Sequence, residues 1–266
     1  MINMNAHEAE LIEEAVRKAG KMMLSARLVD SDIHSKEGPA NFCTEYDTAN
    51  QRFLISEFGT IIPEASYFGE EDTAGNTRCI TDGYTFFIDP IDGTTNFMFG
   101  YDHSCVSVGL AYDAKIVAGW VYDPYTDEMY KAFRGEGAYL NDRRVYIENR
   151  GLSEGIAAFG CARYNDGGID RMLTVVRELF MRAIAIRNGG SAALDISRVA
   201  KGSNVSYFEL LLQPYDYAAA SIIVEESGGK ICQMDGKIIT LDRPCSIIAG
   251  TEKAVSEVIE IYEKNI

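Results

Sequence analysis

The sequence predicts a layered α/β fold, and three observations support this prediction. First, strand-like and helix-like segments alternate through the second half of the chain, which favours strands packed against helices. Second, uncharged runs of β-branched and aromatic residues are typical of buried strands. Third, 266 residues with 47% hydrophobic and 24% charged side chains are enough to bury a core without disulfides.

The first half is expected to begin with an amphipathic helix over residues 6–27, where apolar residues recur every three or four positions. Residues 30–44 contain Gly-Pro and predict a loop. Residues 48–58 predict a second helix that ends at Gly59. The remaining elements of this half are strands at 66–68 and 84–88 and an antiparallel meander over 103–133.

The sequence pattern of the second half predicts four helices and three strands. The helices are expected over 169–180, from Ser191, from Asp216 and after a capping Thr251, and the strands at 183–186, 205–210 and 246–249. No internal repeat or long linker is visible. The stretch 151–155 is the only plausible seam, and it is too short for a flexible tether.

Charge and cysteine usage narrow the class of protein. The chain carries 25 basic and 40 acidic residues, a formal net charge of −15, which argues against a nucleic-acid partner or an anionic membrane surface. No apolar run reaches the roughly 18 residues of a membrane span, and no signal-peptide core is visible. The six cysteines suit neither a zinc site nor a CxxC pair, so we expect a cytoplasmic protein with reduced thiols.

The most informative segment is residues 89–94 (Asp-Pro-Ile-Asp-Gly-Thr), directly after the predicted strand 84–88. The proline fixes φ and the glycine permits a tight bend. Such a turn can aim Asp89, Asp92 and the Ile91 carbonyl at one point, and these hard oxygen ligands suit Mg²⁺ or Mn²⁺. The alternative is an Asx-type turn with solvated aspartates.

Two related interpretations of this segment fail on spacing. An EF-hand loop counted from Asp89 needs Gly at the sixth position and Glu at the twelfth, but the glycine is fifth and the twelfth residue is Gly100. A phosphatase with a nucleophilic aspartate two residues before Asp92 would need a carboxylate where Pro90 stands. Thr94 instead opens a short helix whose first N–H groups could hold a phosphate.

Four other places carry candidate carboxylates. Glu70 and Glu71 follow a strand, although such a pair is common on surfaces. Asp216 begins an apolar helix and has the alternative of a helix N-cap, and Asp47 has the alternative of a helix start. Glu209 lies inside an apolar strand, where a carboxylate needs a partner or a ligand.

Together these segments resemble the inositol monophosphatase family, within a superfamily of metal-dependent, lithium-sensitive sugar phosphatases. The resemblance is carried by residues 69–71 (Gly-Glu-Glu), 89–97 (Asp-Pro-Ile-Asp-Gly-Thr-Thr-Asn-Phe), 215–220 (Tyr-Asp-Tyr-Ala-Ala-Ala) and 223–229 (Ile-Val-Glu-Glu-Ser-Gly-Gly). It extends from about residue 7 to the C-terminus. It implies a layered αβαβα sandwich in a single domain, 1–266, with an α+β half over roughly 1–150 and an α/β half over 151–266.

The resemblance also implies two or three Mg²⁺ ions between the halves. Glu70, Asp89 and the Ile91 carbonyl would hold the first ion, and Asp89, Asp92 and Asp216 the second. Glu70 would also serve a weaker third site, and we count it with the catalytic residues.

Further roles follow from the same resemblance. Thr94, paired with Asp47, would orient or deprotonate the attacking water. The backbone N–H groups of Gly93 and Thr94 would bind phosphate. Lys36 matches a family lysine near the metal cluster, and Glu71 is a further candidate at this site.

Substrate recognition is expected around Glu209, because family enzymes active on inositol carry a Glu seven residues before the C-terminal Asp, here Asp216. Asp92 would also touch a ring hydroxyl. The family's substrate-side turn matches Gly190, Ser191 and Ala192. One departure is Tyr215, where the family usually has Trp, and this difference bears on the exact sugar preference.

The resemblance therefore implies Mg²⁺-dependent hydrolysis of a small polyol phosphate monoester, with inositol 1-phosphate favoured. The alternatives are fructose-1,6-bisphosphatase, histidinol-phosphate phosphatase or 3′-phosphonucleotide phosphatase activity, or a regulator without catalysis that binds a protein partner. Lithium sensitivity and a homodimer are expected from the family. No histidine is needed, since His7, His34 and His103 fall in no motif.

Overall fold

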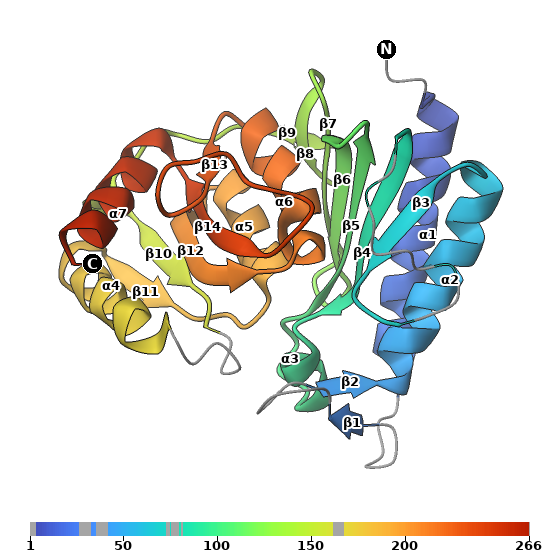
Figure 1. Ribbon diagram of the computed structural model, residues 1–266, viewed down its shortest axis with the longest axis horizontal. Helices are drawn as coiled ribbons and strands as arrows, with labels where there is room; N and C mark the ends of the chain where they lie inside the picture. The colour runs from blue at the N-terminus through green and yellow to red at the C-terminus, as the bar shows by residue number, and fades with distance from the viewer. Residues whose placement is uncertain are drawn as a thin grey trace.

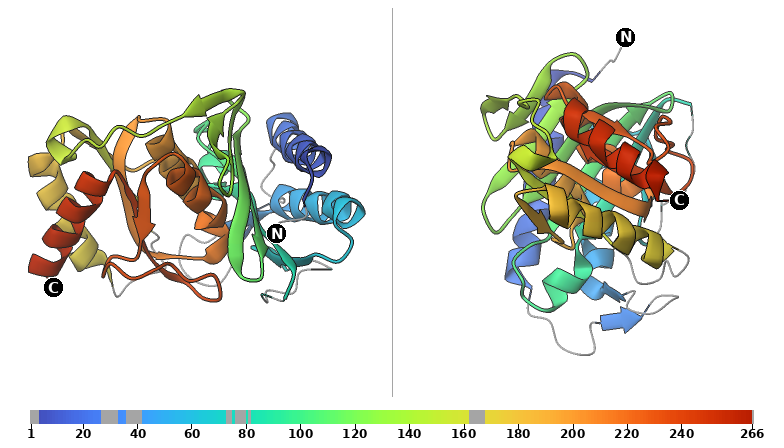
Figure 2. Two further views of the ribbon diagram at one scale, coloured as in Figure 1. Left: turned by 90° about the horizontal axis from the view of Figure 1, so that it is seen from above. Right: turned by 90° about the vertical axis from the view of Figure 1, so that its left-hand side faces the viewer.

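The computed structural model describes residues 4–26, 33–35, 42–72, 75, 80, 82–161 and 168–265. Its helices and sheets stack in five layers, which the view from above separates most clearly (Figures 1 and 2). From one side to the other these are α1 (Ala6–Ser25) with α2 (Glu45–Ile61), a seven-stranded sheet, α5 (Ala192–Ala200) with α6 (Pro214–Glu226), a five-stranded sheet, and α4 (Ile169–Arg182) with α7 (Glu252–Lys264). The predicted αβαβα sandwich is confirmed.

The seven-stranded sheet belongs to the first half of the chain. In spatial order its strands are β3 (Ser66–Gly69), β4 (Tyr84–Asp92), β5 (Cys105–Tyr112), β6 (Lys115–Asp123), β7 (Glu128–Phe133), β8 (Gly137–Leu140) and β9 (Arg143–Val145). Only β3 and β4 are parallel, and the other neighbours are antiparallel. The predicted meander is confirmed in β5 to β7, whereas β8 and β9 are additions that the sequence did not predict.

The five-stranded sheet belongs to the second half. Its spatial order is β11 (Ala185–Arg187), β10 (Ile156–Phe159), β12 (Asn204–Leu212), β14 (Cys245–Gly250) and β13 (Lys230–Cys232). The first three strands are parallel and the last two are antiparallel to their neighbours. A 3₁₀ turn, Leu152–Glu154, lies between the two sheets in sequence, at the predicted seam. That the two halves form a single domain stays a prediction.

Three predictions in the first half are wrong. The predicted loop over 30–44 contains β1 (Ile33–Ser35) and β2 (Phe42–Thr44), which pair antiparallel. Helix α2 begins three residues early, because Thr44 and Asp47 form a capping box in which each side chain bonds the other's backbone. Gly59 does not end α2, since one glycine costs a helix only about 1 kcal/mol.

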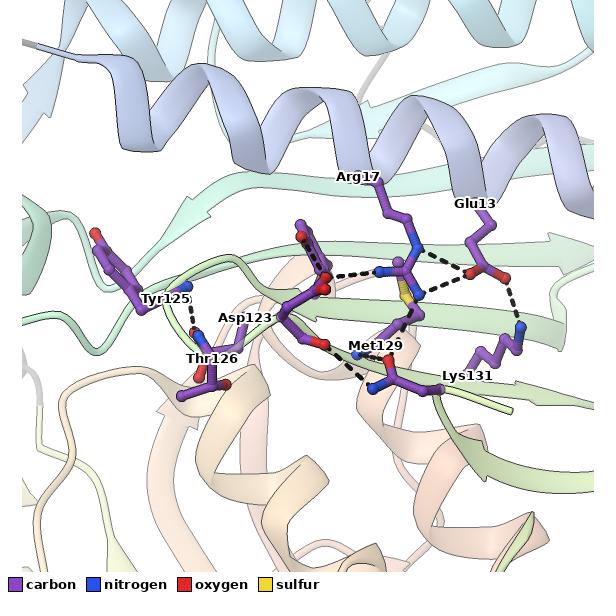
Figure 3. A network of polar contacts seen from close by, with 10 residues as sticks. Glu13, Arg17, Asp123, Tyr125, Thr126, Met129 and Lys131 are labelled. Atoms are coloured by element: carbon purple, nitrogen blue, oxygen red, sulfur yellow. Dashed lines mark hydrogen bonds and ion pairs between the residues drawn. The ribbon is translucent and has the colours of Figure 1, made fainter. Parts of the chain in front are cut away.

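A polar network attaches α1 to the hairpin of β6 and β7 (Figure 3). Arg17 contacts Glu13 on its own helix and donates to Asp127 Oδ1 at 3.0 Å. Lys131 Nζ donates to Glu13 Oε2 at 2.6 Å. These contacts fix the polar side of α1, while its apolar side packs on the sheet. In the part of the chain that the structure describes, none of the helices combines the length and apolarity needed to cross a bilayer.

Two glycines allow α6 to lie directly on the seven-stranded sheet. Gly109 and Gly119 face each other across β5 and β6. A Cβ built on Gly119 would lie 2.5 Å from the carbonyl oxygen of Ala219 and 2.9 Å from its Cα. Because these are backbone atoms of a buried helix, no flexible side chain can move aside.

Gly119→Ala is therefore expected to lower the free energy of unfolding by about 1–3 kcal/mol, because the added methyl over-packs a close contact. Denaturant unfolding followed by circular dichroism measures this change. Gly59→Ala in α2 is the matched control: its Cβ would meet only the Tyr67 hydroxyl, at 3.5 Å, so no loss is expected. An equal loss in both variants would contradict the role given to the contact with α6.

Candidate active site

The site is built where β3 and β4 end. Parallel neighbours end at the same edge of a sheet, so the acidic pair after β3 lies beside the aspartates of β4. The Glu70 N–H donates to the Ile88 carbonyl at 3.0 Å. A register shift between Asp89 and Asp92 distorts the end of β4 against β5. Two carboxylate segments that are distant in sequence therefore meet at one sheet edge.

Residues 89–94 form the Asx-type turn of one interpretation, with the aspartates placed as the metal-binding interpretation requires. Asp89 Oδ1 accepts from the Ile91 N–H at 3.1 Å, which is an Asx turn. The aspartates are buried, however, because Asp89 is 3% exposed and Asp92 is 8% exposed. Gly93 has φ of +88°, which a residue with a Cβ rarely adopts, and α3 (Thr94–Met98) begins directly after it as predicted.

Mutual repulsion among buried carboxylates shapes the electrostatics. Burial raises the pKa of Asp89 well above its usual range, and the negative charges of Glu70, Asp92, Asp216 and Asp47 raise it further. A cation would relieve this repulsion. We call Asp47, Glu70, Glu71, Asp89, Asp92 and Asp216 the carboxylate cluster.

Part of the carboxylate cluster is especially compact. Asp47, Glu70 and Glu71 each offer an oxygen, and these oxygens lie within 4.8 Å of one another. Glu71 is buried, and the Cys43 thiol donates to its Oε2 at 3.1 Å. The backbone of Glu71 is held by Gln51, which accepts from its N–H and donates to its carbonyl at 2.9 and 2.7 Å.

Asp216 belongs to the carboxylate cluster, and the alternative of a helix N-cap is wrong. The N-cap of α6 is Gln213; Asp216 is the third residue of the helix, and its Oδ2 accepts from the Gln213 N–H at 2.7 Å. Burial raises its pKa well above the usual range, and the charges of Asp92, Glu70 and Glu209 add to this. The same carboxylate therefore helps to cap α6 and faces the cluster.

Thr94 and Asp47 are in hydrogen-bond contact. The Thr94 hydroxyl lies 3.1 Å from Asp47 Oδ1 and 3.2 Å from the Ile91 carbonyl oxygen. Asp47 Oδ2 accepts from the N–H and the hydroxyl of Thr44, at 2.8 and 2.5 Å. Because both oxygens of the buried Asp47 are engaged, its carboxylate is fixed in orientation.

Asp92 connects the first half of the chain to the second. Its Oδ2 accepts from the Ser191 hydroxyl at 2.5 Å and the Ala193 N–H at 2.8 Å, and its Oδ1 accepts from the Ala192 N–H at 3.2 Å. Burial raises the pKa of Asp92, while these hydrogen bonds at the start of α5 act in the opposite direction. Gly190, with φ of +79°, forms the turn just before.

Glu209 has the partner that its place in an apolar strand required. The Tyr207 hydroxyl donates to Glu209 Oε2 at 2.6 Å, and both residues are buried. Gly160 makes room for this pair, since a Cβ there would lie 2.1 Å from Oε2. The ring of Tyr215, where the family usually has Trp, lies 6.4 Å from that of Phe68.

Some site residues differ from expectation or were not foreseen. Lys36 lies outside the described residues. Gln51, Thr44 and Tyr207 orient predicted residues but were missed by sequence reasoning. Thr44 carried a usable signal, a capping residue three positions before an acidic one. Tyr207 carried a weaker one, because residues two apart in a strand lie on the same face and Tyr207 precedes Glu209 by two. Gln51 has no local signature, because it holds the backbone of Glu71, 20 positions away.

The donor set suits a hard divalent cation. It consists of carboxylate oxygens with the carbonyl of Ile91 nearby, and oxygen-only sets of this kind are typical of Mg²⁺, Ca²⁺ or Mn²⁺. The raised pKa of Asp89 and of Asp216 indicates negative charge that a bound cation would neutralise. The chemistry of these residues therefore fits a metal site.

Comparison with known proteins assigns the chain to a family. The model of the inositol monophosphatase family matches residues 5–265. The chain is 35% identical to an inositol-1-monophosphatase of Rhizobium meliloti, covering 93% of this chain and 94% of that protein. It is 31% identical to the Nus factor SuhB of Xylella fastidiosa, covering 91% and 90%. The crystal structure of extragenic suppressor protein suhB from Bartonella henselae matches with a TM-score of 0.88 at 30% identity, covering 97% and 99%. The chain therefore belongs to the inositol monophosphatase family of phosphoric monoester hydrolases.

Proposed function

We propose that this phosphatase hydrolyses a small polyol phosphate, most readily inositol 1-phosphate, and that it depends on Mg²⁺. The observation that carries the proposal is the position of Glu209, whose negative charge acts on Asp216 and so lies close to the carboxylate cluster. A site with a metal-binding side and a hydroxyl-binding side suits a polyol that carries one phosphate.

In this proposal Glu70, Asp89, the Ile91 carbonyl, Asp92 and Asp216 hold two or three Mg²⁺ ions. Bound Mg²⁺ would lower the pKa of water and stabilise negative charge on the phosphoryl and leaving oxygens. The buried carboxylates supply fixed negative charge for it, and the Asx turn at Asp89 holds one of them in place.

Thr94 and Asp47 handle the proton of the attacking water. Asp47 is fixed by Thr44, so its Oδ1 keeps a constant direction toward the Thr94 hydroxyl. Thr94 accepts the proton of the water on its oxygen and passes its own proton to Asp47. The backbone N–H groups of Gly93 and Thr94, at the start of α3, bind the phosphate.

Glu209 accepts hydrogen bonds from the hydroxyls of the polyol. Tyr207 holds its Oε2, so the carboxylate presents a fixed orientation to the substrate. Asp92 accepts hydrogen bonds from Ser191 and Ala192, and its negative charge acts on Asp89, so it connects the metal side to the turn over residues 190–192. Recognition by a carboxylate favours neutral polyols over sugars with further anionic groups.

Glu209→Gln is expected to raise KM for inositol 1-phosphate about tenfold with little change in kcat, because the neutral amide accepts weaker hydrogen bonds. Steady-state phosphate release measures both constants. Phenyl phosphate is the control substrate, because it has no ring hydroxyls and its KM should not change. A similar rise in KM for both substrates would contradict the role given to Glu209.

The proposal is tested by phosphate release from inositol 1-phosphate, fructose 1,6-bisphosphate, histidinol phosphate and 3′-phosphoadenosine 5′-phosphate, each with and without Mg²⁺. A Mg²⁺-dependent preference for inositol 1-phosphate is expected. A Mg²⁺-dependent preference for another of the four compounds would contradict the proposed substrate but support the proposed metal site. Silence on all four would favour the second candidate, a protein-binding regulator, which similarity to the Nus factor SuhB supports. Lithium sensitivity, a homodimer and a cytoplasmic location stay predictions.

A further inference from the structure

Three polar residues outside the carboxylate cluster join the two halves of the chain beside it. Asn96 Nδ2, in α3, donates to the carbonyl of His103 at 2.8 Å and to the carbonyl of Gly189 at 2.7 Å. His103 Nε2 lies 3.2 Å from Asp195 Oδ1, in α5. Asp195 Oδ2 accepts from the Gly189 N–H at 3.1 Å. We call Asn96, His103 and Asp195 the latch.

The latch holds one end of the turn that meets Asp92. Gly189 has both its N–H and its carbonyl bound by the latch. Two to four residues later, Ser191, Ala192 and Ala193 all donate to Asp92. The turn is thus fixed at its first residue by the latch and at its end by Asp92.

Close packing makes the position of this turn sensitive to the latch. A Cβ on Gly93 would lie 3.0 Å from the Gly190 carbonyl oxygen and 3.2 Å from that of His103. A Cβ on Gly189 would lie 2.3 Å from Asp195 Oδ2 and 2.6 Å from His103 Nε2. The backbone at Gly93 therefore touches the turn directly, and the latch sets how closely they approach.

The latch borders a cavity. A cavity of about 550 Å³ is lined there by His103, Gly189 and Asp195, among others. His103 is 7% exposed and Asp195 2% exposed. A buried polar pair is by itself weak evidence for a contribution to stability, because apolar side chains of the same size often serve as well. Its directional hydrogen bonds fit a positioning role better.

We propose that Asn96, His103 and Asp195 are positioning residues that set the distance between the phosphate side of the site, at Gly93, and its polyol side, at residues 190–192. This inference rests on the proposed function. The latch touches no reacting atom and acts through the turn. Its loss leaves phosphate binding in place and misaligns the polyol side.

The test compares two substrates in variants of the latch. Asn96→Ala removes both amide donors, and His103→Ala removes the contact with Asp195. Each is expected to lower kcat/KM for inositol 1-phosphate about 10- to 100-fold, the usual cost of losing an orienting residue. For phenyl phosphate, which is held by its phosphate alone, the loss is expected to stay below about threefold. His103→Gln, whose amide can still donate to Asp195, is expected to restore most of the activity.

Ser197→Ala is the matched control, because Ser197 lies in α5, is buried, and has no hydrogen-bond partner for its hydroxyl among the described residues. For this variant, kcat/KM for inositol 1-phosphate and for phenyl phosphate should equal the wild-type values. An equal loss for both substrates in the latch variants, or lower thermal stability with unchanged kcat/KM, would overturn the inference alone. A wild-type enzyme with no activity on inositol 1-phosphate would overturn the proposed function and this inference with it.

Discussion

Asp89→Asn is expected to lower Mg²⁺-dependent phosphate release about 10³-fold and, at the same time, to raise the melting temperature of the metal-free protein. The carboxylate lies at the centre of the repulsion among Glu70, Asp92, Asp216 and Asp47. Without metal, removing its charge relieves that repulsion, and each kcal/mol gained raises the melting temperature by about 2–4 °C. The amide oxygen of asparagine can still accept from the Ile91 N–H, so the turn is kept.

With Mg²⁺ bound, the effect of Asp89→Asn on stability has the opposite sign. Mg²⁺ at a hundred times its Kd is expected to stabilise the wild type by about 2.7 kcal/mol, and this gain should be largely lost in the variant. A loss of about 10³-fold in kcat/KM, or about 4 kcal/mol of transition-state stabilisation, is expected. Thermal unfolding with and without Mg²⁺ and phosphate-release kinetics measure the two effects separately.

Asp142→Asn makes the same chemical change at an exposed turn and should alter neither quantity. Two results would contradict the interpretation. One is a variant that keeps its Mg²⁺-dependent turnover. The other is a metal-free variant that melts below the wild type, because that would mean the charge at Asp89 stabilises the fold rather than opposing it.

The sequence predicted best what is local in the chain. Residues 89–94 lie in one turn, so their composition alone indicated a strand end, an oxygen-rich bend and a helix start, and the structure has all three. The Asx turn was also foreseeable from that segment. What spacing alone did not show is that these aspartates are buried. Burial depends on β3, β5 and α5, which other parts of the chain supply.

Contacts between distant residues were not predictable from patterns. Asp195 and His103 are separated by 92 positions, and neither belongs to a motif. Gln51 holds Glu71 from α2, and a glutamine within a helix carries no signal for such a contact. The resemblance to a family supplied the pairing of Asp47 with Thr94, which composition and spacing had left open.

Some short strands and helix boundaries were not predicted correctly, for a related reason. Short strands such as β9 and β13 have only three residues, too few to establish an alternation of apolar and polar side chains. They are specified by the neighbouring strand with which they pair. The start of α2 depends instead on the reciprocal bonds of Thr44 and Asp47, a local pattern that was present in the sequence and outweighed by the periodicity of the helix.

Thr94→Ala is expected to lower kcat by about 10²- to 10⁴-fold while KM for inositol 1-phosphate changes little, because a positioned proton acceptor contributes that much to the chemical step. The substitution removes the hydroxyl together with the γ-methyl group, and the backbone N–H that binds phosphate in the proposed mechanism remains. The residue lies at the start of α3, where alanine is well tolerated, so the fold should be preserved. Steady-state kinetics with saturating Mg²⁺ measure the change.

Two further variants separate the hydroxyl from its surroundings. Thr94→Ser keeps an oxygen within reach of Asp47 Oδ1 and should recover most of the lost kcat. Thr95→Ala, at the exposed neighbouring position of the same helix, should match the wild type. A large loss in Thr95→Ala would attribute the effect to α3 as a whole. If Thr94→Ala kept its kcat but lost affinity, the hydroxyl would serve binding, and Asp47 would act only as the fixed support that holds it beside the carboxylate cluster.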